Sequence, residues 1–237
     1  MCDLRVEERN EFFESAHAAI EIRYEEGRGR FAVAAEDIDM GVTLFREKPL
    51  TYTLNPEKFG THCQHCFQPI RGVVPCQRCT WVCYCSSQCR SKANASYHKY
   101  ECGIIKLVLG TGLNIYAYMA LRLVTKEGLK NLLKMKDDLE NNRSEKSGTS
   151  HGGSSDAAFY SSNDFRNAYN LMAQEDSINP DMWLLRGLVA VFLLKCLQLT
   201  DFFDQVSTGT ELTPDELFVG GVLFRYVRQI RIDPGSG

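Results

Sequence analysis

Seven cysteines and one histidine lie at short intervals between residues 63 and 102. A gap of two residues between cysteines brings two thiolates within reach of one ion, and a gap of three does the same from one helical turn. Eight such ligands fill two tetrahedral Zn²⁺ sites and leave no open position for a catalytic water, so the predicted sites are structural. With few large apolar residues nearby, metal binding would supply much of the folding free energy. The predicted ligands are Cys63, Cys66, Cys76, Cys79, Cys85, Cys89, His98 and Cys102.

The placement of the other cysteines favours metal binding over disulfide bonds. The chain has ten cysteines, and only Cys2 and Cys196 lie outside residues 63–102. Acidic residues stand near the N-terminus where a secretory signal needs an apolar core, and reduced thiols clustered in this way are typical of metal sites. Cys83 is the remaining thiol of the cluster, and we expect it to be a small core residue. We expect the protein to be in the cytoplasm and nucleus.

Basic residues gather around the predicted zinc sites. The whole chain has a net charge of −3, whereas residues 63–106 contain six arginines and lysines and a single acid, Glu101. The cluster lacks the ~12-residue gap that carries the helix of a groove-reading DNA-binding finger. Basic residues alone give only non-specific contacts to phosphate. We therefore expect no sequence-specific nucleic-acid partner.

Regular structure is predicted on both sides of the cysteine cluster. Two β-prone runs, residues 31–35 and 42–47, and an alternating run at residues 50–54 predict strands. Leucines recur on one helical face from residue 107 to 133, including Leu107 and Tyr116 in the apolar face, with a helix junction at Gly110-Thr111-Gly112.

Two further helices are predicted near the end of the chain. Thr213 can cap the second of them, with Pro214 at its first position and Glu216 completing a capping box. Pro180 fits the first turn of the other. Its apolar run is too short and too often charged to span a bilayer, so we expect a buried helix and no membrane partner. That helix carries Trp183, Leu184, Leu188, Val191 and Phe192.

The ligand spacing resembles that of the MYND-type zinc finger. Eight residues separate Cys89 from His98, where the common pattern has about seven, and Tyr97 stands in for the tryptophan that the family usually has shortly before the histidine. In that family the two zinc ions are bound in crossed fashion. The resemblance therefore implies one site of Cys63, Cys66, Cys85 and Cys89, and a second of Cys76, Cys79, His98 and Cys102.

The residues before the finger resemble the opening of a SET domain in the SET-and-MYND protein-lysine methyltransferases. The similar stretch is EEGRGRFAVAAEDIDMGVTLFREKPLTYTL, and MALRLVTKEGL after the finger is similar to the fourth member of that family. The resemblance implies methyl transfer from S-adenosylmethionine to a lysine of a protein substrate. In the family, an Asn-His-x-Cys segment and a later tyrosine complete the site, and neither is present here. We expect a fragment, a truncated isoform or an incomplete gene model that is inactive alone, with catalytic residues unknown.

The resemblance also implies a cofactor-binding turn at Gly27, Arg28, Gly29 and Arg30. The glycines allow the backbone to approach a ligand closely, and the arginines suit the carboxylate of S-adenosylmethionine. Taken alone, the four residues are a weak signal and favour a basic turn before a strand, and it is the finger downstream that favours the cofactor interpretation.

These observations predict an α+β protein: a partial SET β-sheet interrupted by a two-zinc MYND finger and followed by a helical region. An alternative function is a non-catalytic module in which the finger binds protein partners, as MYND fingers bind proline-containing peptides. The expected divisions are an acidic segment (1–26), the N-terminal part of the SET domain (27–62), the finger (63–102), a helical segment (103–136), a flexible loop (137–163) and a second helical region (164–237).

Overall fold

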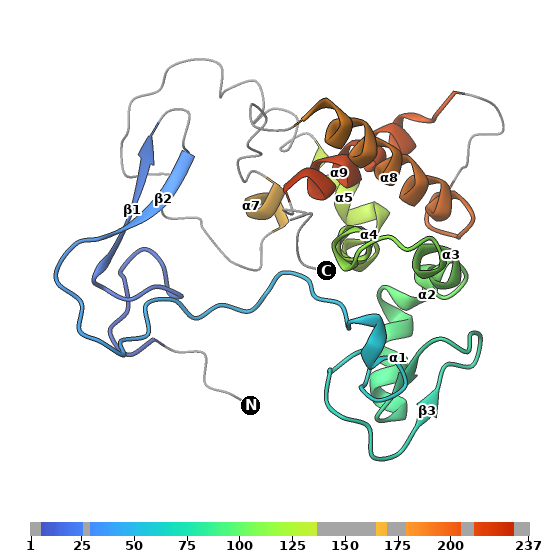
Figure 1. The fold of residues 1–237 in the computed structure, drawn as a ribbon, viewed down its shortest axis with the longest axis horizontal. Coiled ribbons are helices and arrows are strands. Elements are labelled where there is room, and N and C mark those ends of the chain that lie inside the picture. The colour runs from blue at the N-terminus through green and yellow to red at the C-terminus, as the bar shows by residue number, and fades with distance from the viewer. Residues whose placement is uncertain (1–5, 26–28, 137–164, 170–178, 205–210, 230–237) are drawn as a thin grey trace. The chain divides into compact units, whose positions relative to one another are not determined.

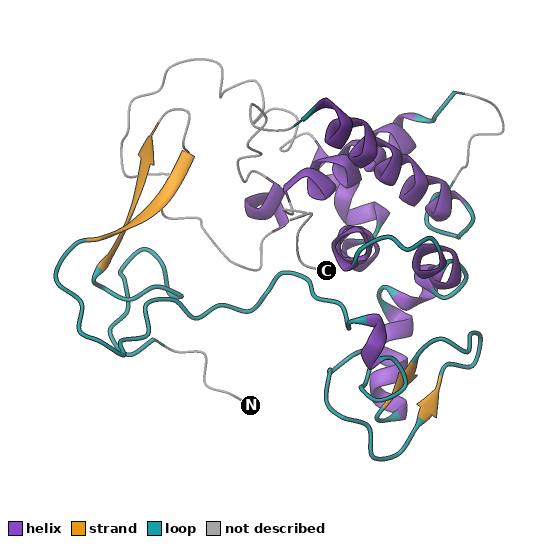
Figure 2. Cartoon of the chain, viewed as in Figure 1, coloured by secondary structure: helices purple, strands orange, loops and turns teal. Residues whose placement is uncertain are grey.

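The computed structural model describes residues 6–25, 29–136, 165–169, 179–204 and 211–229. The chain forms two compact units, one of residues 1–50 with 138–172 and one of residues 51–137 with 173–237. The described parts combine small two-stranded sheets with helices, so the predicted α+β class is confirmed (Figure 2). The predicted flexible loop lies outside the described residues.

The first unit contains a β-hairpin. Strand β1 (Ile20–Glu25) pairs antiparallel with β2 (Gly29–Ala34), and Ile20 lies opposite Ala34 (Figure 1). The predicted strand at residues 31–35 is thus present and already begins at Gly29. A short helix, α7 (Phe165–Tyr169), belongs to the same unit and buries both of its terminal aromatic side chains.

The two other predicted strands, at residues 42–47 and 50–54, are not formed. Phe45 makes only an isolated bridge with Ala16. A strand is stable when one of its faces is buried along its length. Here the side chains of Val42, Phe45 and Tyr52 are exposed and only Leu54 of the two runs is buried, so neither run has a face that is buried along its length.

The second unit begins with the cysteine-rich segment. It contains the single turn η1 (Pro56–Lys58), a short hairpin of β3 (Val74–Pro75) and β4 (Cys83–Tyr84), and helices α1 (Ser87–Ala95) and α2 (His98–Glu101). Helix α1 begins where it does because the Ser86 hydroxyl accepts a hydrogen bond from the Cys89 N–H at 3.2 Å, which satisfies one of the free donors at its start.

Three helices follow directly: α3 (Ile105–Gly110), α4 (Ile115–Glu127) and α5 (Leu129–Lys134). The predicted junction is confirmed, because Gly112 has φ +70° and ends the turn after α3. The predicted apolar face is wrong at Leu107 and Tyr116, whose side chains are exposed. Arg122 and Thr125, two polar residues of α4, are buried instead.

Helices α8 (Pro180–Gln198) and α9 (Pro214–Gln229) pack on each other and on α4. The predicted capping box is confirmed: the Glu216 N–H donates to the Thr213 hydroxyl at 3.2 Å, and the Thr213 N–H donates to the Glu216 carboxylate at 2.8 Å. None of the described helices combines the length and apolarity needed to cross a bilayer.

The prediction that α8 is a buried helix is only half right. One face packs in the core, with Val189, Ala190, Leu193 and Leu197 buried. The side chains of Leu184, Leu188 and Val191 are exposed. The sequence is apolar around the whole helix, so its composition could not show that one face has no partner among the described residues.

Candidate metal centre

The first group of potential ligands contains four cysteines. Their sulfur atoms all lie within 4.8 Å of one another. Cys85 Sγ is 3.5 Å from Cys66 Sγ and 3.6 Å from Cys89 Sγ. Cys85 follows β4 and Cys89 lies in the first turns of α1, so the hairpin and the capped helix together position half of the group. The members are Cys63, Cys66, Cys85 and Cys89.

The turn between Cys63 and Cys66 is a tight knuckle. The Phe67 N–H donates to the Cys63 carbonyl at 2.9 Å, and the His65 N–H points at Cys63 Sγ at 3.5 Å. Phe67 has φ +63°, an unfavourable value for a residue with a side chain. The Tyr52 ring meets the Phe67 ring edge-on at 4.8 Å and helps to hold it there.

The second group contains three cysteines and the histidine. His98 Nε2 lies 3.3 Å from Cys76 Sγ and 3.7 Å from Cys79 Sγ, and Cys76 Sγ lies 3.8 Å from Cys102 Sγ. His98 is the first residue of α2 and Cys102 caps its C-terminal end, so a single helical turn supplies two ligands. The members are Cys76, Cys79, His98 and Cys102, and the two groups are those that the resemblance implied.

The ionisation of the first group favours a bound dication. Burial raises the pKa of Cys63. Hydrogen bonds from the backbone N–H groups of Cys66, Cys85 and His65 outweigh this effect and lower the pKa to about 7. Burial and the neighbouring thiols raise the pKa of Cys66 to about 12. The Cys63 thiolate therefore forms readily, and its negative charge opposes the ionisation of the neighbouring Cys66 thiol. A divalent cation removes this repulsion, so the four sulfurs fit a zinc ion.

The second group has the same character. Burial raises the pKa of Cys76, and N–H groups of the knuckle lower it below its usual value. Burial and the nearby Cys79 and Cys76 raise the pKa of Cys102 to about 12. Burial lowers the pKa of His98 to about 4, so its ring is neutral at pH 7, the form that binds metal. Two structural zinc ions therefore fit the eight side chains, and all four positions on each are protein ligands.

The remaining thiol and histidines of this segment lie outside both groups. Cys83 is buried in β4, its carbonyl accepts a hydrogen bond from the Gln64 N–H at 3.1 Å, and burial raises the pKa of its thiol. It is a core residue, as predicted. His65 lies against Tyr97 with its Nδ1 3.4 Å from the Tyr97 hydroxyl, and His62 contacts Thr61.

Sequence reasoning missed a buried polar network beside the second group. The Glu101 carboxylate is 0% exposed and accepts hydrogen bonds from the Arg122 guanidinium, two of them at 2.7 Å. The Tyr118 hydroxyl at 2.9 Å and the Thr125 hydroxyl at 2.7 Å complete its shell. This network explains why α4 buries polar residues. The one signal for it was that Glu101 is the only acid in a basic segment and stands between two ligands.

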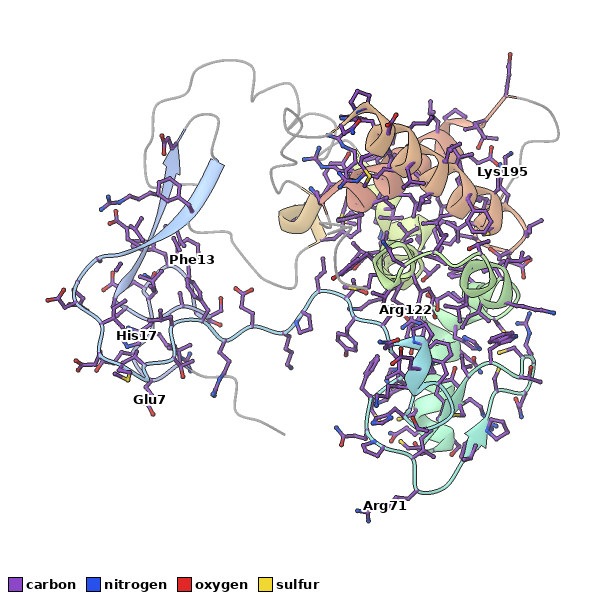
Figure 3. The ribbon with its side chains drawn as sticks, in the orientation of Figure 1. Glu7, Phe13, His17, Arg71, Arg122 and Lys195 are labelled. Carbon is purple, nitrogen blue, oxygen red and sulfur yellow. The ribbon has the colours of Figure 1, made fainter. Side chains whose placement is uncertain are left out.

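Arg122 also contacts the finger through an aromatic ring. Its guanidinium lies 3.7 Å from the centre of the Tyr97 ring, at the junction of α4 and the finger (Figure 3). Burial lowers the pKa of Arg122, but the Glu101 carboxylate raises it more, so the group stays charged. The Tyr97 hydroxyl donates to the Gln64 carbonyl at 2.9 Å. Tyr97 thus links the cation to the first knuckle.

The predicted cofactor turn is described only in part. Gly27 and Arg28 lie outside the described residues. Gly29 and Arg30 begin β2, and their backbones pair with Glu25 and Tyr24 of β1. Of the four predicted residues, the hairpin therefore positions the backbones of Gly29 and Arg30 at the start of β2.

Comparison with known proteins agrees with this geometry. The sequence model of the MYND finger family matches residues 63–102. Protein-lysine N-methyltransferase SMYD4 of Gallus gallus is 24% identical over 279 aligned positions, which cover 94% of this chain and 37% of the relative. The Homo sapiens protein of the same name is 29% identical over 151 positions, covering 56% of this chain and 18% of the relative.

A more distant organism gives a similar result. A SET and MYND domain-containing protein of Dictyostelium discoideum is 34% identical over 86 positions, covering 33% of this chain and 16% of the relative. The chain therefore spans well under half the length of these curated relatives.

Proposed function

We propose that this chain is part of an enzyme that methylates protein lysines with S-adenosylmethionine. The chain carries a MYND finger and is homologous, at modest identity, to SET and MYND domain-containing protein-lysine methyltransferases. The observation that supports this most is the extent of the similarity. It covers 94% of the chain in the Gallus gallus relative, so it reaches well beyond the 40 residues of the finger.

In this proposal the zinc ions do no chemistry, because each has four protein ligands and no place for a substrate. S-adenosylmethionine supplies a methyl group on a sulfonium that leaves readily. The residues of this chain that would bind it are Gly27, Arg28, Gly29 and Arg30, of which Gly29 and Arg30 begin β2. The glycines admit the cofactor close to the backbone, and an arginine pairs with its carboxylate.

A calorimetric titration with S-adenosylmethionine tests this role on a protein that contains these residues. Arg28→Ala and Arg30→Ala should weaken binding, each by about 1.5–3 kcal/mol if a charge-assisted hydrogen bond is lost. Arg23→Ala is the control, since Arg23 is an exposed residue of β1 whose guanidinium pairs with Glu21 of the same strand, and it should leave the affinity unchanged. Unchanged affinity in both turn variants would remove the cofactor assignment.

The 237 residues tested alone should bind S-adenosylmethionine weakly and transfer no methyl group. The Asn-His-x-Cys segment that the resemblance places in the same pocket is not among them. Micromolar binding by these residues alone would contradict this expectation and would mean that the hairpin suffices.

One observation supports a second function, the binding of a protein partner by the finger. Trp81 is 41% exposed in the loop that joins β3 to β4, two residues after the ligand Cys79, and tryptophan is enriched at protein interfaces. Proline-containing peptides should change the fluorescence of Trp81, and Trp81→Ala should abolish binding while zinc content stays the same. Equal binding by the variant would exclude this surface.

A further inference from the structure

Helix α8 carries an apolar stripe on the face opposite its packed side. Its side chains are 66% exposed at Leu184, 49% at Leu185, 59% at Leu188 and 55% at Val191. Residues spaced by three, four and seven positions lie on one face of a helix. Other residues of α8, such as Val189 and Leu193, are buried, and the helix packs on α9 and α4.

Such a stripe requires an explanation. A helix that is apolar on all sides is normally buried on all sides. A contiguous exposed apolar patch on a folded protein usually marks an interaction site. Because the stripe follows a single helix of 19 residues, its natural partner is another helix laid alongside it.

The charges that flank the stripe indicate which helix this is. Asp181 lies seven residues before Leu188, and Lys195 lies seven residues after it. Seven residues are almost two complete turns, so all three side chains lie on the same line along the helix. Asp181 and Lys195 are both exposed, and Figure 3 labels Lys195 on α8. The stripe thus carries one acid and one base at equal distances from a central leucine.

We propose that this face binds the same face of a second copy of the chain, with the two α8 helices antiparallel and Leu188 at the two-fold axis. In that arrangement each residue n positions before Leu188 faces the residue n positions after it on the other copy. Asp181 of each copy then faces Lys195 of the other, and Leu184 faces Phe192. A parallel arrangement would instead place like charges opposite each other, which is unfavourable.

The symmetry of the charges is what favours a second copy over another protein. A different partner would need only a complementary face, and nothing would require an acid and a base equidistant from one leucine. A contact built from one helix of each copy is at the small end of specific interfaces, so we expect a dissociation constant in the micromolar range, on the order of 1–100 µM. This inference is independent of the proposed enzymatic function.

Sedimentation equilibrium on the zinc-loaded chain over about 1–200 µM tests the proposal, since this range brackets the expected dissociation constant. We expect a monomer–dimer equilibrium that Leu188→Asp abolishes, because it places two carboxylates at the axis. The matched control is Leu217→Asp, since the Leu217 side chain is also largely exposed but lies on α9 outside the stripe, and it should leave the equilibrium unchanged. A monomer at every concentration, or a dimer that survives Leu188→Asp, would overturn the proposal.

Charge reversal tests the antiparallel arrangement. Asp181→Lys and Lys195→Asp should each weaken the dimer, by roughly tenfold, because each places like charges opposite each other twice per dimer. The double variant Asp181→Lys/Lys195→Asp restores both pairs and should restore the dimer. An equimolar mixture of the two single variants should also associate more tightly than either alone. If neither the double variant nor the mixture regains affinity, the antiparallel pairing is wrong.

Discussion

Arg122 of α4 holds Glu101 of α2 through two hydrogen bonds of 2.7 Å, from Nε to Oε1 and from Nη2 to Oε2. Both residues are almost completely buried, at 3% and 0% exposed. Glu101 stands between two zinc ligands, His98 and Cys102. A buried ion pair therefore joins the finger to the helical region at the second metal group. Buried charges of this kind are tolerated only when their hydrogen bonds are fully satisfied.

Breaking this pair should destabilise the second unit strongly. Glu101→Gln leaves the Arg122 charge buried without its partner, and the free energy of unfolding in urea should fall by roughly 3–5 kcal/mol. The matched control is Arg23→Ala, which removes an exposed ion pair with Glu21 and should produce no measurable change. Equal stability of Glu101→Gln and the wild type would show that the pair is not closed in solution.

Removing both charges should cost less than the two single changes together. The double variant Glu101→Leu/Arg122→Met keeps the volume apolar and leaves no unpaired charge, so its loss of stability should be well below the sum for Glu101→Leu and Arg122→Met. The difference is read from a double-mutant cycle by urea unfolding with zinc present. Strict additivity would mean that the two side chains act independently.

The zinc content should distinguish ligands from the neighbouring thiol. Eight ligands fill two tetrahedral sites, so atomic emission should find about two zinc ions per chain. Cys76→Ser should lose zinc from the second group and unfold the finger, whereas Cys83→Ser should keep both ions, because Cys83 belongs to neither group. A ratio near one in the wild type would exclude the two-site arrangement.

Much of this could be predicted from the sequence, because the signals are local. Zinc ligands two or three residues apart, the Thr213–Glu216 capping box and the break at Gly112 each depend on a few consecutive residues. The pairing of the ligands into two groups came from the family resemblance and could not come from spacing.

What could not be predicted depends on contacts between distant residues. Glu101 and Arg122 are 21 positions apart, and an acid in a basic segment is ordinarily a surface residue. The exposed stripe of α8 was missed because apolar composition shows only that a face can be buried. It does not show whether a neighbouring element covers that face. The strands expected at residues 42–47 and 50–54 failed for a related reason, since neither run has a face that is buried along its length.

Acid should release zinc from the second group. The pKa of His98 is about 4 in the folded chain and about 6.5 when the ring is exposed, since burial disfavours the charged ring. Between these values the unfolded state binds the extra proton. The free energy of unfolding therefore falls as the pH drops through this window, by at most about 1.4 kcal/mol per pH unit.

The measurement is zinc release to a colorimetric chelator as the pH is lowered through that window. His98→Cys should move the midpoint, because a thiolate and an imidazole bind protons differently. His62→Gln should leave it unchanged, because His62 lies outside both groups. Coincident curves for all three proteins would mean that His98 does not bind the metal.

Two adjacent glycines of α9 should respond differently to alanine. A Cβ at Gly221 meets nothing within 4 Å, so Gly221→Ala should stabilise the helix by about 0.5–1 kcal/mol. A Cβ at Gly220 would lie 3.1 Å from Cδ2 of Leu194, where α9 packs on α8, so Gly220→Ala should lose that gain or destabilise the protein. Thermal unfolding with zinc present measures both. Equal stabilisation by the two changes would mean that α8 and α9 pack less closely.

Because Glu101 lies between His98 and Cys102, the presence of zinc in the second group should affect the stability of helix α4. Removing the ion frees the turn that carries the carboxylate, and Arg122 then loses its only fixed counter-charge within the network described here. Helix α4 should open locally, and its amide protons should exchange with deuterium faster although none of its residues binds metal. In a cell short of zinc, the helical region would then be exposed to proteases together with the finger, so the two would be degraded as one unit.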